Sequence, residues 1–183
     1  SVIVKFKVKG EDAYFLAWTT TPWTLLSNVA LCVNAKETYC LAQADGVKYY
    51  MAKALVPSVL GEEAEILKEL TGKDLEYKEY EPLWNYAPAD KKAYYVTNAD
   101  YVTLTDGTGI VHIAPAFGED DANVGRSYNL PFVQLVEPDG TMGKGTQWEG
   151  VFVKDADKEI IKYLDEKGVL LKAIPFTHSY PFC

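Results

Sequence analysis

The sequence predicts a β-rich α+β domain, with its strands arranged as a barrel or a sandwich. Short apolar segments of strand length follow one another at close spacing, separated by Gly, Asp or Pro turns. Helical periodicity is confined to a few short segments, and no internal repeat is visible. With 183 residues, 48% of them hydrophobic, the chain is large enough to bury one core, which favours a single domain over 1–183.

The N-terminal part of the chain is predicted to be mostly strand. Residues 2–9 alternate apolar residues with lysines, as in a half-buried strand, and a turn at 10–12 leads into a hairpin partner at 13–20. Ala44-Asp45-Gly46 is typical of a hairpin turn. The further strands expected here are 29–33, 38–42 and 48–51.

Helical signals are fewer and shorter. Residues 52–60 are predicted to be helical, whereas 64–70 fit a helix or a strand equally well. A short helix is expected at 119–128, ended by Asn129.

The best defined helix is predicted at 155–166. Asp155 is its expected N-cap, Ile160 and Leu164 share one apolar face, and Gly168 follows its end.

The charge and hydropathy of the sequence limit which kinds of partner the chain can bind. The formal net charge is −8, and Arg126 is the single arginine. Because phosphate contacts are made by Lys and Arg, this balance argues against extensive polynucleotide binding, although a pocket for only the last nucleotide of an RNA remains compatible with it. The apolar runs are far shorter than the roughly 20 residues of a membrane-spanning helix, so no membrane insertion is expected.

The cysteines indicate the compartment. Cys32, Cys40 and Cys183 are odd in number and include no CxxC pair, which argues against a disulfide framework and for a reducing, cytoplasmic location. The chain lacks an initiator Met and starts within a strand-like pattern. We expect it to be a domain of a longer polypeptide.

Two stretches are dense in residues that can carry chemistry. The first, "AWTTTPWT" at 17–24, reads as a strand that stops at Pro22, because the residue before a proline is pushed out of helical conformation. Beyond the last strand pairing, the hydroxyls and amides of Thr19, Thr20 and Thr21 become free to bind a ligand.

The second stretch, "DGTGIVHIAPAFGEDD" at 106–121, predicts a tight turn, a buried strand carrying His112, and a helix whose first turn holds three acids. Helix N-termini stabilise carboxylates, so each acid alone is best read as a helix cap. Together, beside His112, they suit recognition of a small cation such as an ammonium group. A metal would need more ligands than these residues offer.

Other enzyme classes lack their motifs in this sequence. There is no GxSxG nucleophile elbow, no phosphate-binding P-loop and no cysteine pair of a zinc site. His112 and His178 are the only histidines. Each is, by itself, more often structural than catalytic.

The two dense stretches together resemble a known family. "WTTTPWTL" at 18–25, "GTGIVHIAPAFGEDD" at 107–121, then "YNLP", "PDG" and a terminal "HSYPFC" are similar to the inserted editing (CP1) domain of isoleucyl-tRNA synthetase, in the expected order along the whole chain. Related valyl and leucyl enzymes carry Arg and an acidic residue where this sequence has Thr21 and Trp23, which favours the isoleucyl branch.

The resemblance implies a β-barrel core with a few short peripheral helices. It also implies hydrolytic editing of valine misattached to isoleucine tRNA, with valyl-adenylate as a second candidate substrate and isoleucine excluded by pocket size. The HIGH-like and KMSKS-like motifs of the synthetic centre do not occur in the chain, so no ligase activity and no cofactor is expected. Residues 175–183 would begin the return connection to the parent synthetase.

Site residues follow from the same resemblance. Asp121 matches the aspartate that holds the α-ammonium group. Thr19, Thr20 and Thr21 match the threonines that line the site, and together with Asp121 they are the catalytic candidates. The remaining substrate-binding candidates are Trp23, Thr24, His112 and Ala114.

The partners implied are the aminoacylated 3′ end of isoleucine tRNA, its valine moiety and the rest of the synthetase, with the chain itself a monomer. No protein nucleophile is required, because a positioned water can attack an ester. The alternatives are a non-catalytic module that binds an aminoacyl-adenosine end, and an editing domain of the valyl or leucyl type.

Overall fold

Nine strands form one mixed sheet in the computed structural model, which describes residues 1–88 and 90–174. The order is β6-β4-β5-β2-β8-β3-β7, and β1 pairs with β2 and β9. The strands are β1 (Val2–Lys7), β2 (Tyr14–Thr19), β3 (Ala30–Val33), β4 (Thr38–Ala44), β5 (Val47–Ala52), β6 (Glu65–Thr71), β7 (Tyr95–Asn98), β8 (Val111–Ile113) and β9 (Leu170–Ala173).

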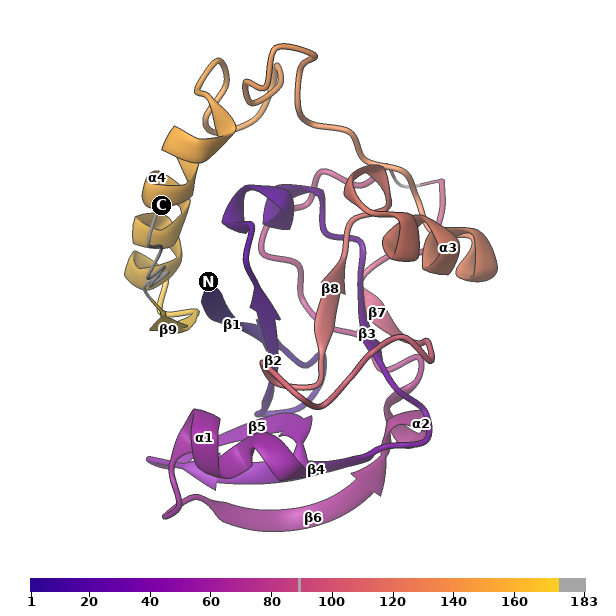
Figure 1. The fold of residues 1–183 in the computed structure, drawn as a ribbon, viewed down its shortest axis with the longest axis vertical. Coiled ribbons are helices and arrows are strands. Elements are labelled where there is room, and N and C mark those ends of the chain that lie inside the picture. The colour runs from indigo at the N-terminus through magenta and orange to yellow at the C-terminus, as the bar shows by residue number, and fades with distance from the viewer. Residues whose placement is uncertain (89, 175–183) are drawn as a thin grey trace, which may run out of the picture.

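The helices are short and peripheral, except for one of moderate length that packs beside β9 (Figure 1). The 3₁₀ helices are η1 (Pro22–Ser27), η2 (Lys53–Leu55) and η3 (Pro115–Phe117). The α-helices are α1 (Val56–Leu60), α2 (Gly72–Leu75), α3 (Glu119–Tyr128) and α4 (Val153–Glu166). No described helix is long and apolar enough to cross a membrane.

The sheet curls because one edge of β2 serves two partners in succession. Near its start β2 pairs with β5, at Tyr14 and Phe15, and near its end Trp18 pairs with Val111 of β8. The sheet therefore divides, with β5, β4 and β6 forming the layer at the bottom of Figure 1.

Isolated bridges close the curled part of the sheet into a barrel. Tyr80 bridges to Val8, just after β1, and its neighbour Glu79 bridges to Tyr95 of β7. The hydrogen-bonded path thus runs from β1 through β2, β8, β3 and β7 and back to the end of β1.

Alternation along the strands divides the core. Val4 and Phe6 of β1 face one large buried cluster together with Phe15, whereas Ile3 and Leu16 face another, under α1. This is the period of two expected for strands that are covered on both faces.

The sequence-based elements are largely confirmed, including the β1–β2 hairpin and the β4–β5 turn, where Asp45 and Gly46 both have positive φ. Helix 119–128 is confirmed, and Asn129 ends it in the left-handed conformation. The ambiguous segment 64–70 is strand β6.

Two predictions are corrected. The expected helix 52–60 is divided into η2 and α1, because Pro57 lies at the start of α1, where its missing N–H costs no hydrogen bond. Asp155 is not an N-cap: α4 begins at Val153, after Phe152, and has no side-chain cap. Asp155 lies instead in the first turn.

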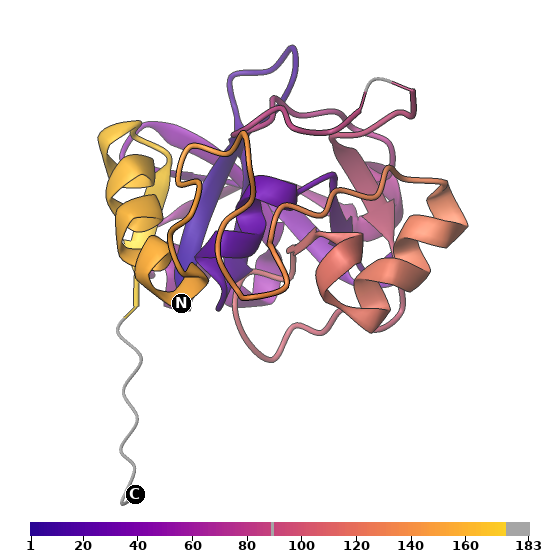
Figure 2. The same cartoon turned by 90° about the horizontal axis from the view of Figure 1, so that it is seen from above.

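Residues 129–152 connect α3 to α4 along the face of the barrel that carries η1 (Figure 2). The predicted return connection at 175–183, including Cys183, lies outside the described residues.

Candidate active site

A cavity of about 200 Å³ lies at the ends of β2 and β8. These strands are parallel neighbours, so their carboxyl ends meet at the same edge of the sheet. Pro22 then starts η1 and Pro115 starts η3, which ends both strands at this point. The cavity is lined by Trp18, Thr19, Thr20, Thr21, Thr24, Val111, His112, Ala114, Phe117 and Asp121.

All but one of the predicted site residues thus line a single cavity, although they come from segments about 90 positions apart in the sequence. The exception is Trp23. Its ring packs edge-on against Phe117, with ring centroids 5.0 Å apart, and so lies behind a lining residue. The backbone N–H of Trp23 donates to Asp157 Oδ1 of α4 at 3.0 Å.

Among the residues that the structure describes, Asp121 is the only charged one that lines the cavity. It belongs to the first turn of α3, as do Glu119 and Asp120, but those two are exposed and do not line the cavity. Asp121 Oδ2 accepts the N–H of Ala114 at 2.9 Å, which ties the helix start to the end of β8. Burial raises the pKa of Asp121 above its ordinary value, so a cationic ligand beside it would be favoured.

The threonines form a connected set of hydroxyls. Thr19 Oγ1 accepts the N–H of Thr21 at 3.1 Å, and the hydroxyls of Thr21 and Thr24 lie 2.9 Å apart. Thr20 is the most exposed of the run.

His112 is buried beneath these hydroxyls. Its Nε2 lies 2.9 Å from Thr24 Oγ1, and its Nδ1 lies 3.4 Å from the amide nitrogen of Asn28. Burial lowers the pKa of His112 to about 4, so the ring is neutral at pH 7. His112 is therefore held in place by two hydrogen-bond partners and also forms part of the cavity wall.

Five residues near the site were not predicted as part of it. Trp18, Val111 and Phe117 line the cavity, and all three lie within the two stretches that contain the predicted residues. Asn28 contacts His112 on the side away from Thr24, and Tyr80 in turn contacts Asn28. No local pattern in the sequence distinguishes Tyr80 from the other tyrosines.

A second cavity of about 200 Å³ adjoins the first. Trp18 and Val111 line both, and Asp106 is a charged residue of the second. The remaining lining residues are Tyr101, Val102, Thr103, Thr108, Gly109 and Ile110.

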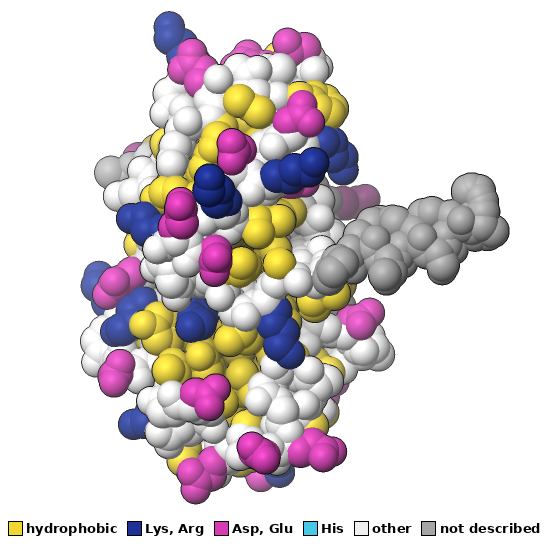
Figure 3. Space-filling view, turned by 90° about the vertical axis from the view of Figure 1, so that its left-hand side faces the viewer, with side chains coloured by type: hydrophobic (Ala, Val, Ile, Leu, Met, Phe, Trp, Pro, Cys, Tyr) yellow, Lys and Arg dark blue, Asp and Glu magenta, His cyan; other side chains and the backbone are white. Residues whose placement is uncertain are grey.

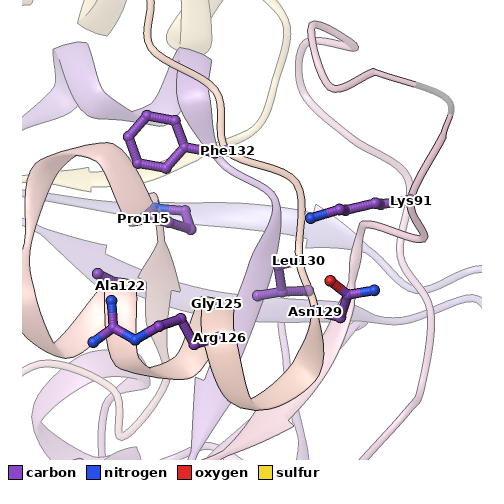
Figure 4. A pocket seen from close by; sticks show the side chains of 8 residues that line it. All are labelled: Lys91, Pro115, Ala122, Gly125, Arg126, Asn129, Leu130 and Phe132. Carbon is purple, nitrogen blue, oxygen red and sulfur yellow. The ribbon is translucent and has the colours of Figure 1, made fainter.

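A larger groove of about 340 Å³ runs along α3 and the chain that follows it, with Lys91 and Arg126 as its charged residues and Phe132 over Pro115 (Figure 4). It contains none of the predicted site residues. The cavity at the strand ends, rather than the larger groove, therefore combines hydroxyls, an imidazole and a carboxylate.

The described cysteines offer no nucleophile. Cys32 and Cys40 are free and buried, and burial raises their thiol pKa values to about 12 and about 11. Within residues 1–88 and 90–174, no group of three or more His, Cys, Asp or Glu side chains is placed to hold a metal ion.

The sequence is similar to isoleucine–tRNA ligases over its whole length. It is 52% identical over 184 residues to that of Clostridium kluyveri, a match that covers 100% of this chain and 18% of the relative. The chain thus spans about a fifth of the length of the curated relatives it matches. No protein-family model matches it.

The fold is similar to that of leucyl-tRNA synthetase editing domains. The GlLeuRS-CP1 crystal structure superposes with a TM-score of 0.76 at 15% identity, covering 98% of this chain and 99% of that one. The editing domain of the P. knowlesi cytosolic leucyl-tRNA synthetase gives 0.73 at 13% identity, covering 92% and 94%. Along its whole length the chain matches part of the isoleucine–tRNA ligases in sequence, and it has the fold of the CP1 editing domains of leucyl-tRNA synthetases.

Proposed function

We propose that this chain hydrolyses the ester of valine misattached to isoleucine tRNA. The observation that carries the proposal is Asp121, the single charged group in a cavity otherwise lined by hydroxyls, one neutral imidazole and apolar surface. A carboxylate in such a setting recognises the α-ammonium group of an aminoacyl ester by a charge-assisted hydrogen bond.

The two adjoining cavities match the two parts of such a substrate. The amino acid occupies the cavity that contains Asp121, and the terminal adenosine occupies the neighbouring cavity that contains Asp106. The ester then lies near the wall that Trp18 and Val111 share. Valyl-adenylate, which joins the same amino acid to adenosine through a phosphate, is the second substrate.

Water is the nucleophile in this proposal, and the threonine hydroxyls and backbone amides orient it. An ester needs no covalent enzyme intermediate, and orientation alone lowers the barrier substantially. No cofactor takes part.

Selectivity comes from size. A site that binds isoleucine rejects valine by only about 1–3 kcal/mol, so discrimination requires a second site that valine enters and isoleucine does not. Forcing one more methylene into a filled cavity displaces side chains, typically at a cost of about 1–3 kcal/mol.

In this proposal the chain works as a monomer within a synthetase that delivers the tRNA. The free thiols of Cys32 and Cys40 are consistent with a cytoplasmic location.

The test compares loss of valine and of isoleucine from isoleucine tRNA in the presence of this chain and of two matched variants. Asp121→Asn removes the charge in the cavity, and Asp120→Asn removes the neighbouring charge, which is exposed. We expect faster loss of valine than of isoleucine. Asp121→Asn should slow it about 10- to 100-fold, the range for a hydrogen bond to a charged group, while Asp120→Asn leaves it unchanged.

Other outcomes assign a different function. An ester that survives longer with the chain than without it would indicate a binding module. Preferential loss from valine or leucine tRNAs would indicate a different branch of editing domains. Loss of both esters at the uncatalysed rate would contradict hydrolysis by this chain.

A further inference from the structure

A chain of hydrogen bonds runs from the interior of the barrel to the cavity. It begins at the Tyr80 hydroxyl, which donates to Asn28 Oδ1, and passes through Asn28 to His112. From His112 it continues to Thr24 and then to Thr21, which lines the cavity. The position of each proton in this chain follows from the orientation of the Asn28 amide.

The orientation of the Asn28 amide is fixed by two of its hydrogen bonds. Its Nδ2 donates to the carbonyl oxygen of Ala30 at 2.8 Å, while its Oδ1 accepts from Tyr80. The reversed amide would place two carbonyl oxygens in contact and leave the Tyr80 hydroxyl facing an N–H group. The second hydrogen of Nδ2 therefore points to Nδ1 of His112, 3.4 Å away, and Nδ1 accepts it without a proton of its own.

The neutral ring must then carry its proton on Nε2, which donates to Thr24 Oγ1 at 2.9 Å. Thr24 in turn donates its own proton to the carbonyl oxygen of Thr21 at 2.8 Å. Its oxygen is left to accept from the Thr21 hydroxyl at 2.9 Å. The Thr21 proton is thereby engaged with Thr24, and the Thr21 oxygen remains an acceptor, with the Thr19 hydroxyl 3.4 Å away.

We propose that Tyr80 is a positioning residue: by holding Asn28 in one orientation it sets the Nε2–H tautomer of His112, which leaves the Thr21 hydroxyl as a hydrogen-bond acceptor for the attacking water. The role of the water rests on the proposed hydrolysis. The tautomer does not, since it follows from the hydrogen bonds alone.

Tyr80 is well suited to hold this position. It is 2% exposed and lies in the segment that closes the barrel, with its ring packed edge-on against Phe6 at 5.2 Å. Burial raises the pKa of its hydroxyl well above the ordinary value, so the group keeps its proton and can donate it at neutral pH.

The first experiment determines the tautomer of His112 by ¹H–¹⁵N NMR of the labelled chain at pH 7, with His112→Gln to assign the signals against His178. We expect a proton on Nε2 in the wild type. A proton on Nδ1 would overturn the proposal without any substitution at Tyr80.

The second experiment compares Tyr80→Phe with Tyr50→Phe. Tyr50 is also a buried tyrosine, 3% exposed, but its hydroxyl donates to Glu11, away from the cavity. Tyr80→Phe should give a mixture of His112 tautomers and slow valine deacylation about tenfold, as for one lost orienting hydrogen bond. Tyr50→Phe should change neither, and an unchanged tautomer in Tyr80→Phe would overturn the proposal.

Asn28→Asp provides a variant of nearly the same shape if Tyr80→Phe does not fold. Its carboxylate can only accept, so the proton of His112 should move to Nδ1. A His112 proton that stays on Nε2 in this variant would contradict the proposal. If the tautomers change as expected but the wild type hydrolyses no ester, the proposed function fails and the hydrogen-bond chain stands.

Discussion

At the scale of single residues, side chains of the same chemistry that are neighbours in the sequence have different roles because their surroundings differ. Glu119, Asp120 and Asp121 are consecutive acids on one helical turn, and only Asp121 lines the cavity. Its oxygen accepts the N–H of Ala114, a residue seven positions away. A carboxylate held in this way has a defined direction, which an exposed acid on a helix lacks.

His112 makes the stability of the fold depend on pH. Its pKa is about 4 in the folded chain and about 6.5 when unfolded, so the folded state binds fewer protons between these values. The stabilisation is complete above pH 6.5 and is lost as the pH falls towards 4. Relative to His112→Gln, the wild type should therefore lose about 2–4 kcal/mol of unfolding free energy between pH 7 and pH 4.

Urea denaturation of both proteins at several pH values measures this difference. Asp121 and Asp157 have raised pKa values and shift stability with the opposite sign, but both are present in each protein and cancel. A pH dependence that is the same in the two proteins would show that His112 is not buried in its neutral form.

At the scale of elements, the site depends on contacts between segments that are distant in the chain. The 3₁₀ helix η1, which carries Thr24, packs against α4 and is held there by the bond from the Trp23 N–H to Asp157. Helix α4 lies more than 120 residues later in the chain, so its role for the site cannot be read from its own amphipathic pattern.

Asp157→Ala should destabilise the chain by about 1–2 kcal/mol, because the Trp23 N–H loses its partner, and should slow deacylation several-fold. Asp157→Asn, which keeps an acceptor oxygen, should cost less. Asp155→Ala is the matched control, since Asp155 is an exposed residue on the same helix. Chemical denaturation and valine deacylation provide the readouts, and equal effects of the two alanine variants would exclude the proposed contact.

Gly109 controls how closely β5 approaches the turn before β8. It has φ of +79°, and an added Cβ would lie 2.5 Å from Cβ of Ala52. Gly109→Ala should therefore cost about 2–5 kcal/mol, from backbone strain and overpacking together. Gly145→Ala, also at positive φ but with open space around it, should cost only about 1–2 kcal/mol in the same thermal or chemical denaturation experiment.

At the scale of the whole molecule, charge limits how the chain can hold RNA. The net charge is −8, and on the face that carries α4 and β9 the basic and acidic side chains are interspersed, with hydrophobic side chains between them (Figure 3). A surface of this kind contacts few phosphates, in agreement with a substrate held by its last nucleotide.

Binding of isoleucine tRNA by the isolated chain should therefore be weak and only slightly dependent on salt. With one or two phosphate contacts, the association constant should fall less than about tenfold between about 50 and 200 mM salt, whereas six to ten contacts would cost about 10³- to 10⁵-fold. Fluorescence anisotropy with labelled tRNA measures the slope. A steep slope would reveal a phosphate-binding surface larger than the charge suggests.

The sequence by itself determined the local structure and the chemistry of the site. Alternating patterns identified the early strands, and Pro22 and Pro115 marked where β2 and β8 end, because a proline acts on its own backbone and its neighbour. The two dense stretches also contained every described residue that lines the cavity.

Only the tertiary structure decided which of these residues meet. The four-residue strands β7 and β9 carry too little pattern to be recognised alone, and the start of α4 is set by packing, because no side chain caps it. The pairing of Trp18 with Val111 brings the two stretches to one edge, and the closing segment brings Tyr80 to Asn28. Such contacts join residues that local periodicity cannot relate, since their geometry exists only once the sheet has curled and closed.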